Sequence, residues 1–190
     1  MAENKVEFGL SNVHYAPFTV VAGVPTFEEP IAIPGAVTLT MDPIGEEYKF
    51  FADNIVYYIV KSNQGYSGTL SIANIPQQFA IDALGEELDE TDGVVNELAL
   101  AQGKQFALLF QFEGDVKARR HVLYNCIANR PSLTGNTKQE STEITAKDLA
   151  LTASPLDIDG KLLVKTRTTE TTDAAVYDVW FNSVYKKVTP

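Results

Sequence analysis

The chain has 190 residues, 45% of them hydrophobic, and a formal net charge of −10 with a pI near 4.6. This length and hydrophobic content are enough for one domain with a core of ordinary size, and they exclude a chain that is disordered throughout. The acidity excludes a protein that grips nucleic acid, because binding phosphates requires Lys and Arg to displace condensed counterions.

The expected place of synthesis is the cytoplasm. The first ten residues, MAENKVEFGL, lack the apolar run of a signal peptide. No stretch approaches the roughly 18 apolar residues of a membrane span, so no membrane partner is expected. The single cysteine, Cys126, cannot form an internal disulfide, which suits a reducing compartment.

Short runs of β length, separated by Gly, Pro, Asn and Asp, follow one another along most of the chain. Strands are expected at residues 35–41, 54–61, 66–73, 94–101, 104–113, 117–128, 137–151 with an interruption, 161–168 and 175–185. SNQG, residues 62–65, predicts a tight hairpin between two of these strands, and EGDV, residues 113–116, predicts another.

One short helix is expected over about residues 76–84. Pro76 suits its first turn and Gly85 suits the position after its last. Its apolar stripe consists of Phe79, Ala83 and Leu84. A helix of this length is marginal alone in water, so we expect it to dock on a sheet.

The fold is therefore predicted to be mainly β. We expect a single domain over residues 1–190, built as a β-sandwich or barrel with one lateral helix and long loops. An extended early loop is expected over residues 42–54, and flexible ends are expected at both termini.

Two of the expected strands are apolar on both faces. Successive side chains of a strand point to opposite faces, and a half-exposed strand should therefore alternate apolar and polar residues. In residues 55–60, IVYYIV, both alternating sets are apolar, and in residues 106–112, FALLFQF, the second set becomes polar only at Gln111. One short helix covers few such side chains, so another copy of the chain is expected to cover the rest.

Candidate catalytic motifs fail on spacing. GYSGT, residues 65–69, misses the G-x-S-x-G nucleophile elbow by one position. Cys126 and His121 are five residues apart on one expected strand, and an odd separation places two side chains on opposite faces. His14 has no Cys or carboxylate at metal-ligand spacing. No enzyme activity and no cofactor are expected, and a hydrolase with an unfamiliar site is the rival hypothesis.

Negative charge is concentrated in one region. Residues 42–97 contain eleven Asp and Glu but two Lys, a balance of −9. The densest cluster consists of Glu86, Glu87, Asp89, Glu90 and Asp92. An EF-hand with Gly93 as its sixth residue would place Leu88 at the first ligand position, so the pattern fails as a calcium loop. We expect a solvated acidic loop, with a weak cation site as the alternative.

Sequence blocks spread from end to end resemble the major tail proteins of long, non-contractile-tailed phages, the tail tube family. In order, the blocks are VEFGLSNVHYAP, IAIPGAVTLTMDP, FADNIVYY, NQGYSGTL, FALLFQFEGD, RRHVLYNCIANRP, TKQESTEIT, DLALTASP and VYDVWFNSVY. No single block is diagnostic. Their order and spacing, with the helix that ends at Gly85, are similar to the family over roughly residues 6–185.

The resemblance implies a structural role in the virion tail, after synthesis in the host cytoplasm. Proteins of this family assemble into hexameric rings, and stacked rings make the tube through which genomic DNA leaves the capsid. Each subunit lends strands to an inner β-barrel and packs its helix outside. The implied partners are further copies of the chain and the tape measure, tail terminator and tail tip proteins, while duplex DNA passes without specific binding.

The long connection between two early strands touches the adjacent ring in such tubes, and here it corresponds to DPIGEEYKFFADN, residues 42–54. The candidate contact residues are Glu46, Glu47, Tyr48, Phe50 and Phe51. An exposed aromatic pair marks a contact surface, so Phe50 and Phe51 point to association. The alternative is that both rings fold back onto their own sandwich.

The acidity suggests how such a tube conducts DNA. A duplex carries one negative charge per ~1.7 Å, and a lumen lined with Lys and Arg would hold it. Carboxylates would instead repel it over a Debye length of ~8 Å and keep it centred. The hypothesis is an acidic-lined conduit, with part of the acidic excess at the contact between rings or on the outer surface.

A rival function is a monomeric β-sandwich module that binds carbohydrate. Exposed aromatic side chains stack on sugar rings, and Tyr15, Tyr66 and Trp180 are the candidates. Trp180 lies in YDVWFNSV, where most residues of both alternating sets are apolar, and it is expected in the core or in an interface.

Overall fold

The computed structural model of the chain describes residues 3–135, 137 and 145–187. The strands are β1 Glu7–Val21, β2 Val24–Phe27, β3 Ile31–Ala32, β4 Ala36–Ile44, β5 Glu47–Ala52, β6 Ile55–Lys61, β7 Gly65–Ile72, β8 Glu87–Asp89, β9 Val94–Asn96, β10 Phe106–Gly114, β11 Arg119–Ala128, β12 Lys147–Ser154, β13 Leu156–Ile158, β14 Lys161–Leu163 and β15 Lys165–Arg167. The helices are α1 Gln77–Phe79, its π-helical continuation η1 Ala80–Leu84, and α2 Ala174–Asp178. The predicted mainly β class is confirmed.

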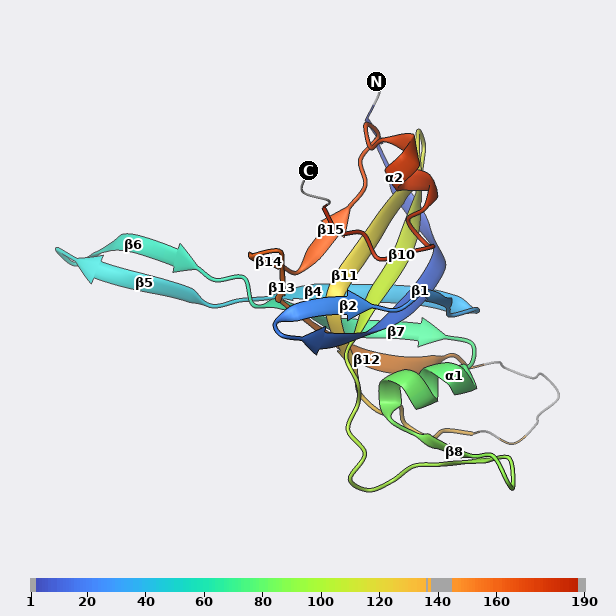
Figure 1. The fold of residues 1–190 in the computed structure, drawn as a ribbon. Helices are drawn as coiled ribbons and strands as arrows, with labels where there is room; N and C mark the ends of the chain where they lie inside the picture. Colours follow the sequence, from blue (N-terminus) through green and yellow to red (C-terminus); the bar gives the residue numbers. More distant parts are fainter. Residues whose placement is uncertain (1–2, 136, 138–144, 188–190) are drawn as a thin grey trace.

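A 9-stranded antiparallel sheet forms the body of the molecule (Figure 1). Its order is β2-β1-β10-β11-β12-β7-β4, with β15 beside β11 and β3 beside β1. The sheet curls until β4, at one end, contacts β1 near the other. Three further pairs, β5-β6, β8-β9 and β13-β14, are hairpins outside this sheet.

The larger core cluster fills the inside of the curl. Its fully buried side chains include Tyr15, Leu70, Ile72, Phe106, Leu108, Leu123, Leu149 and Leu151. Helix α1 and its continuation η1 dock against them, with Phe79, Ala83 and Leu84 buried as the sequence predicts. Pro76 precedes the first turn and Gly85 ends the helix at φ 79°, a left-handed conformation that suits glycine. The predicted lateral helix is thus confirmed.

The second face of β10 is covered by the chain's own C-terminal segment. Ala107 and Leu109 on that face pack in a second cluster with Trp180, Val184 and Ile158. This corrects the expectation that another copy or the lateral helix would cover this strand. It also means that β10 is apolar on both faces because both faces are interior.

Residues 175–185, expected as a strand, begin as the helix α2 and continue as turns. Asp173 caps the helix, since its carboxylate accepts a 2.8 Å hydrogen bond from the Ala175 amide. Val176, Trp180 and Val184 follow at intervals of four, which is a helical spacing, and all three pack in the second cluster. The alternating pattern was therefore misinterpreted.

Replacing Trp180 by Ala should destabilise the fold by about 3–5 kcal/mol, because its ring is buried and stacks on Tyr185 at 5.4 Å between centroids. Its indole N–H also donates a 3.3 Å hydrogen bond to the His121 carbonyl. Denaturant unfolding measures the loss. Val179→Ala, at a neighbouring side chain that is 46% exposed, is the control and should cost less than about 1 kcal/mol. Equal losses for the two variants would contradict this role of the C-terminal segment.

The strand β1 was not expected from the sequence, because Gly9 and Asn12 interrupt its pattern. Both residues have positive φ, 64° and 51°, and each lies at a register shift between β1 and β10. The interruptions are β-bulges that the strand absorbs.

A bulge also overturns the prediction for Cys126 and His121. Phe106 pairs with Cys126 and Leu108 pairs with Leu123, so three residues of β10 lie opposite four of β11, and β11 holds one extra residue there. Leu123 and Cys126 consequently lie in the same core cluster, whereas the odd spacing predicted opposite faces for Cys126 and His121. Cys126 is fully buried, and burial raises the pKa of its thiol to about 12, so the thiol stays protonated and unreactive at pH 7.

Three expected strands have different bounds. The strand expected at 94–101 is β9, which ends at Asn96, and the strand expected at 161–168 is divided into β14 and β15. β12 begins at Lys147, and residues 138–144 of the strand expected there lie outside the described residues, as do residues 1–2 and 188–190 of the expected flexible ends. The hairpin predicted at 113–116 is confirmed by the pairing of β10 with β11.

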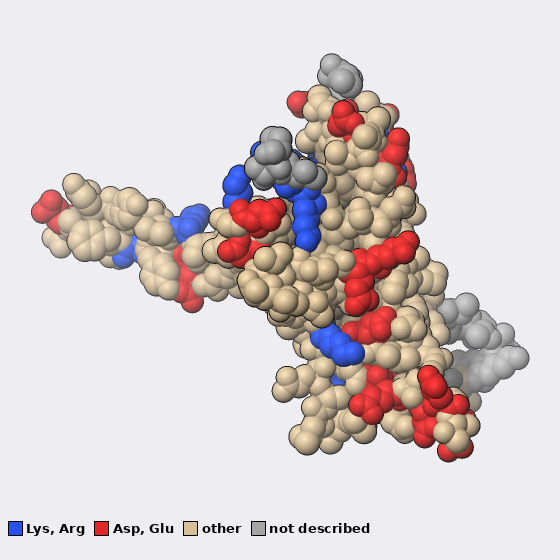
Figure 2. All heavy atoms as spheres, viewed as in Figure 1, with Lys and Arg blue, Asp and Glu red and all other residues tan. Residues whose placement is uncertain are grey.

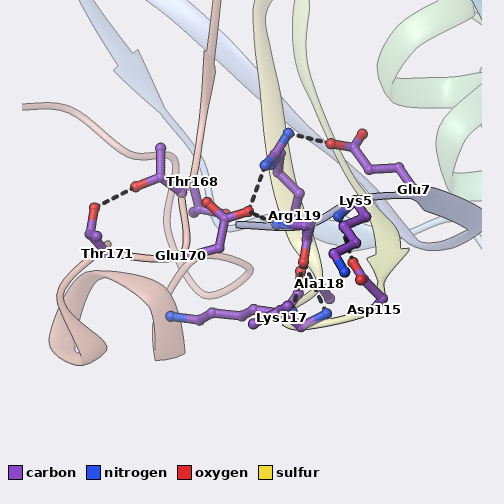
Figure 3. Close-up of polar contacts among 12 residues, drawn as sticks. Lys5, Glu7, Asp115, Lys117, Ala118, Arg119, Thr168, Glu170 and Thr171 are labelled. Carbon is purple, nitrogen blue, oxygen red and sulfur yellow. Dashed lines mark hydrogen bonds and ion pairs between the residues drawn. The ribbon is translucent and has the colours of Figure 1, made fainter. Parts of the chain in front are cut away.

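A polar network ties the N-terminal residues to the sheet (Figure 3). Arg119 lies between Glu7 and Glu170, with its Nη2 2.6 Å from Glu170 Oε1. Glu170 also accepts a 3.1 Å hydrogen bond from the Asn4 amide, and the Asn4 side chain donates to the Lys117 carbonyl at 2.7 Å. The Asn4 amide first, then the backbone amide of Glu170 itself and the Arg119 side chain, lower the pKa of Glu170 to about 2.

This tie should weaken in acid. Because the folded pKa of Glu170 lies below its ordinary value of 4.5, the stabilisation is complete above about pH 4.5 and is lost as the pH falls to about 2. Hydrogen exchange at the Asn4 amide, followed by NMR across that window, measures the loss. Glu170→Gln should remove the pH dependence, and an unchanged pH profile in this variant would contradict the assignment.

Candidate assembly surface

Strands β5 and β6 form an arm that projects from the body (Figure 1). The arm continues the sheet, because β4 leads into β5 and β6 leads into β7. Between these strands the Ser62 amide donates to the Glu46 carbonyl and the Gln64 amide to the Ile44 carbonyl, both at 2.9 Å. The arm is therefore an extension of an antiparallel ribbon that is anchored in the body.

This arrangement corrects two predictions. Residues 42–54, expected as an extended loop, are the end of β4 and the whole of β5 up to the turn. SNQG, residues 62–65, does not join a hairpin, since β6 pairs with β5 while β7 pairs with β4 and β12. The chain instead reverses at Asp53 and Asn54.

The reversal at the tip is a two-residue turn. Asp53 and Asn54 have φ of 52° and 63°, and they are flanked by the paired residues Ala52 and Ile55. Positive φ at both central positions defines the turn type whose twist matches a β-hairpin. Asp and Asn adopt positive φ more readily than other non-glycine residues. The dipeptide Asp-Asn between two apolar runs is the signal that sequence reasoning missed.

The arm is exposed on both faces. Nine large apolar side chains are exposed: Tyr48, Phe50, Phe51, Ile55, Val56, Tyr57, Tyr58, Ile59 and Val60. Phe50 and Phe51 are 63% and 61% exposed, so they do not fold back onto the body, and that alternative is excluded for this conformation of the chain. An exposed apolar surface of this size is typical of a site that contacts another protein, a ligand or a membrane.

The register divides the arm into two faces. Strand alternation places six side chains on one side, here called the aromatic face: Tyr48, Phe50, Ala52, Ile55, Tyr58 and Val60. The opposite, mixed face has Glu47, Lys49, Phe51, Val56, Ile59 and Lys61. Tyr57 is the extra residue at a register shift opposite Phe50 and Phe51. The aromatic face carries no charge.

Charges on the mixed face gather at the base of the arm. Glu47 lies 2.9 Å from the Lys49 ammonium and 3.1 Å from that of Lys61, and hydrogen bonds from these two lysines lower the pKa of Glu47. Glu46 accepts a hydrogen bond from the Tyr48 hydroxyl. Figure 2 shows the rest of the arm largely free of charged atoms on the visible side. The ion pairs are exposed and add little stability, but they neutralise the base.

The structure thus places the predicted contact residues Glu46, Glu47, Tyr48, Phe50 and Phe51 on the arm or at its base. Residues 55–60 also belong to the arm. The sequence showed that this strand is apolar on both faces, but it did not show that the strand pairs with the predicted contact segment. The two halves belong together because the turn at the tip pairs them.

The predicted acidic cluster lies elsewhere, on the hairpin β8-β9 (Figure 1). Asp89 accepts a 2.9 Å hydrogen bond from the Thr91 amide, and Gly93 closes the turn at φ 69°. Glu87, Glu90 and Asp92 are exposed, and Glu86 and Asp89 are partly exposed. No group of three or more His, Cys, Asp and Glu in the described residues is arranged to hold a metal ion. The cluster expected as a loop is a small, solvated hairpin.

Two of the three aromatic residues proposed for carbohydrate stacking are not available at the surface. Tyr15 and Trp180 are buried, at 0% and 2% exposure. Tyr66 is half-buried, and the Lys165 ammonium lies 4.5 Å from its ring centroid. Among the described residues, no helix combines the length and apolar character that crossing a bilayer requires.

Replacing Asn54 by Val should destabilise the arm without affecting the body. A β-branched residue is strained at the positive φ of Asn54, at a cost of about 1–2 kcal/mol. NMR hydrogen exchange should show faster exchange of the β5 and β6 amides and an unchanged core. Asn54→Gly, which accepts this φ, should keep the arm protected, and equal protection in the Val variant would contradict the turn assignment.

Comparisons with known proteins give only weak likenesses. No family model matches the chain, and no curated protein matches it. A cryo-EM structure of the anti-feeding prophage baseplate, 6-fold symmetrised, is similar at TM-score 0.47 and 10% identity, over 90% of this chain and 100% of that one. The tube terminating cap of the same prophage is similar at TM-score 0.42 and 14% identity, over 89% and 95%. Likenesses of this strength assign the chain to no family.

Proposed function

We propose that the chain is a structural, non-enzymatic subunit of a phage tail, which assembles with copies of itself into hexameric rings that stack as the tail tube. The observation that carries this proposal is the arm, whose nine large apolar side chains are exposed. Burying such a side chain stabilises by about 1.5 kcal/mol or more, so the arm contributes on the order of the 4–15 kcal/mol that association costs.

The shape of the arm favours assembly into a closed ring or a filament. It extends away from the body, so its contact surface and the surface that receives it belong to different copies (Figure 1). A contact between the arm of one copy and the body of another is heterologous, and it generates a ring where the rotation closes and a filament where it does not. The two-stranded ribbon also has unpaired edges that further strands can extend.

The finer parts of the proposal rest on the family resemblance of the sequence blocks. These parts are the hexamer, the inner β-barrel, the tape measure, terminator and tip proteins as partners, and passage of duplex DNA without specific binding. The net charge of −10 supports a conduit that repels DNA, since carboxylates near the duplex keep it hydrated and mobile.

The double variant Phe50→Ser, Phe51→Ser should abolish rings and tubes while leaving the monomer folded. Both side chains are exposed, and neither belongs to one of the two hydrophobic core clusters. Negative-stain microscopy at high protein concentration shows the assemblies, and thermal unfolding checks the fold. Val20→Ser with Val21→Ser, an exposed apolar pair outside the arm, is the matched control and should still assemble. Normal tubes from the arm variant would refute the assignment, and a wild-type chain that stays monomeric would refute the function.

A further inference from the structure

A pocket opens at the rim of the curled sheet, between β4 and the strands β10 and β11. Its volume is about 360 Å³, and its lining includes Leu39, Met41, Tyr66, Phe110, Phe112 and His121. An apolar cavity of about 150 Å³ holds one benzene ring, so this pocket has room for an aromatic side chain. Its lining is mostly apolar and partly buried, which suits an aromatic occupant.

His121 is the buried polar group in this lining, and its bonding is incomplete. It is 8% exposed, stacks on Phe110 at 5.0 Å between centroids, and its buried Nε2 has no hydrogen-bond partner among the described residues. Burial, with Lys165 and Arg167 nearby, lowers the pKa of His121 to about 4, so the imidazole is neutral at pH 7. A neutral imidazole nitrogen pairs well with a hydroxyl, and a buried one left unpaired costs stability.

The arm carries a matching group. Tyr58 lies in the middle of the aromatic face, paired with Phe50, and is 63% exposed. The tip has one charge, the carboxylate of Asp53, and the pocket lining includes the cation Lys165, with Arg167 paired to His121 in the adjacent strand. A tyrosine for the unpaired imidazole and an acidic tip for a basic rim are complementary.

The pocket and the arm of one molecule do not meet. Tyr66 lines both this pocket and the hollow at the base of the arm, so the pocket lies where the arm leaves the body. From there the arm extends outward (Figure 1). The pocket is therefore reached by the arm of a neighbouring molecule, which leaves that neighbour's own pocket open for the next copy.

We propose that this pocket receives the aromatic face of the arm from a second copy of the chain, with the Tyr58 hydroxyl hydrogen-bonded to His121 Nε2. The proposal rests on the proposed self-assembly and adds the receiving surface and its specific contact. It makes Tyr58 and His121 the residues that select the register of one subunit against the next.

Disulfide cross-linking tests the docking. Val60→Cys lies beside Tyr58 on the aromatic face, and Thr40→Cys lies at an exposed residue of the pocket. Oxidation of the assembled double variant should give a ladder of cross-linked oligomers on a non-reducing gel, and buried Cys126 should not compete. Val60→Cys with Leu100→Cys, 93% exposed and outside the pocket, is the control and should give none.

The outcomes separate the two proposals. Rings that form without a Thr40 cross-link, or with an equal one at Leu100, would overturn the pocket assignment and leave self-assembly standing. Protein that neither assembles nor cross-links would overturn both.

Substitution tests the hydrogen bond. Tyr58→Phe should raise the concentration needed for assembly about tenfold, and Tyr57→Phe should change it less than about twofold. In a His121→Phe background, Tyr58→Phe should have an effect below about twofold, because the partner is already absent. An equal effect of Tyr58→Phe in both backgrounds would overturn the pairing.

Discussion

The structure depends on how apolar side chains on both faces of a strand are removed from water. In β10 the chain accomplishes this itself, with the inside of the curled sheet and its helix on one face and the C-terminal segment around Trp180 on the other. In the β5-β6 arm neither face is covered. The same sequence pattern therefore has two outcomes, and the difference is distance from the body, because the arm extends beyond the reach of the covering segments (Figure 1).

The body serves to hold the arm in place. The arm is continuous in the chain with two strands of the sheet, β4 before it and β7 after it, and β7 is in turn paired with β12. A contact on the arm is thus transmitted to the sheet through backbone hydrogen bonds. The pairing of β5 with β6 orders the arm, and an ordered surface loses less conformational freedom on association than a loop would.

Charge is distributed so that it does not oppose contact at the arm. The ion pairs of Glu47 with Lys49 and Lys61 neutralise the base, while the acidic cluster lies on the separate β8-β9 hairpin. A chain with a net charge of −10 repels its copies at long range, but this repulsion is screened over ~8 Å at physiological salt. Apolar contact between an uncharged face and a mostly apolar pocket is compatible with that repulsion.

The sequence by itself determined the features that depend on residues close together along the chain. Pro76 and Gly85 bound the helix, the β10-β11 hairpin follows from its turn, and the mainly β class follows from strand propensity and length. Only the tertiary structure decided which faces are covered, because covering residues are distant in sequence: Trp180 packs beside Leu109. Bulges in β1 and β11, and the pairing of residues 47–52 with 55–61, likewise depend on partner strands, whose register no local pattern specifies.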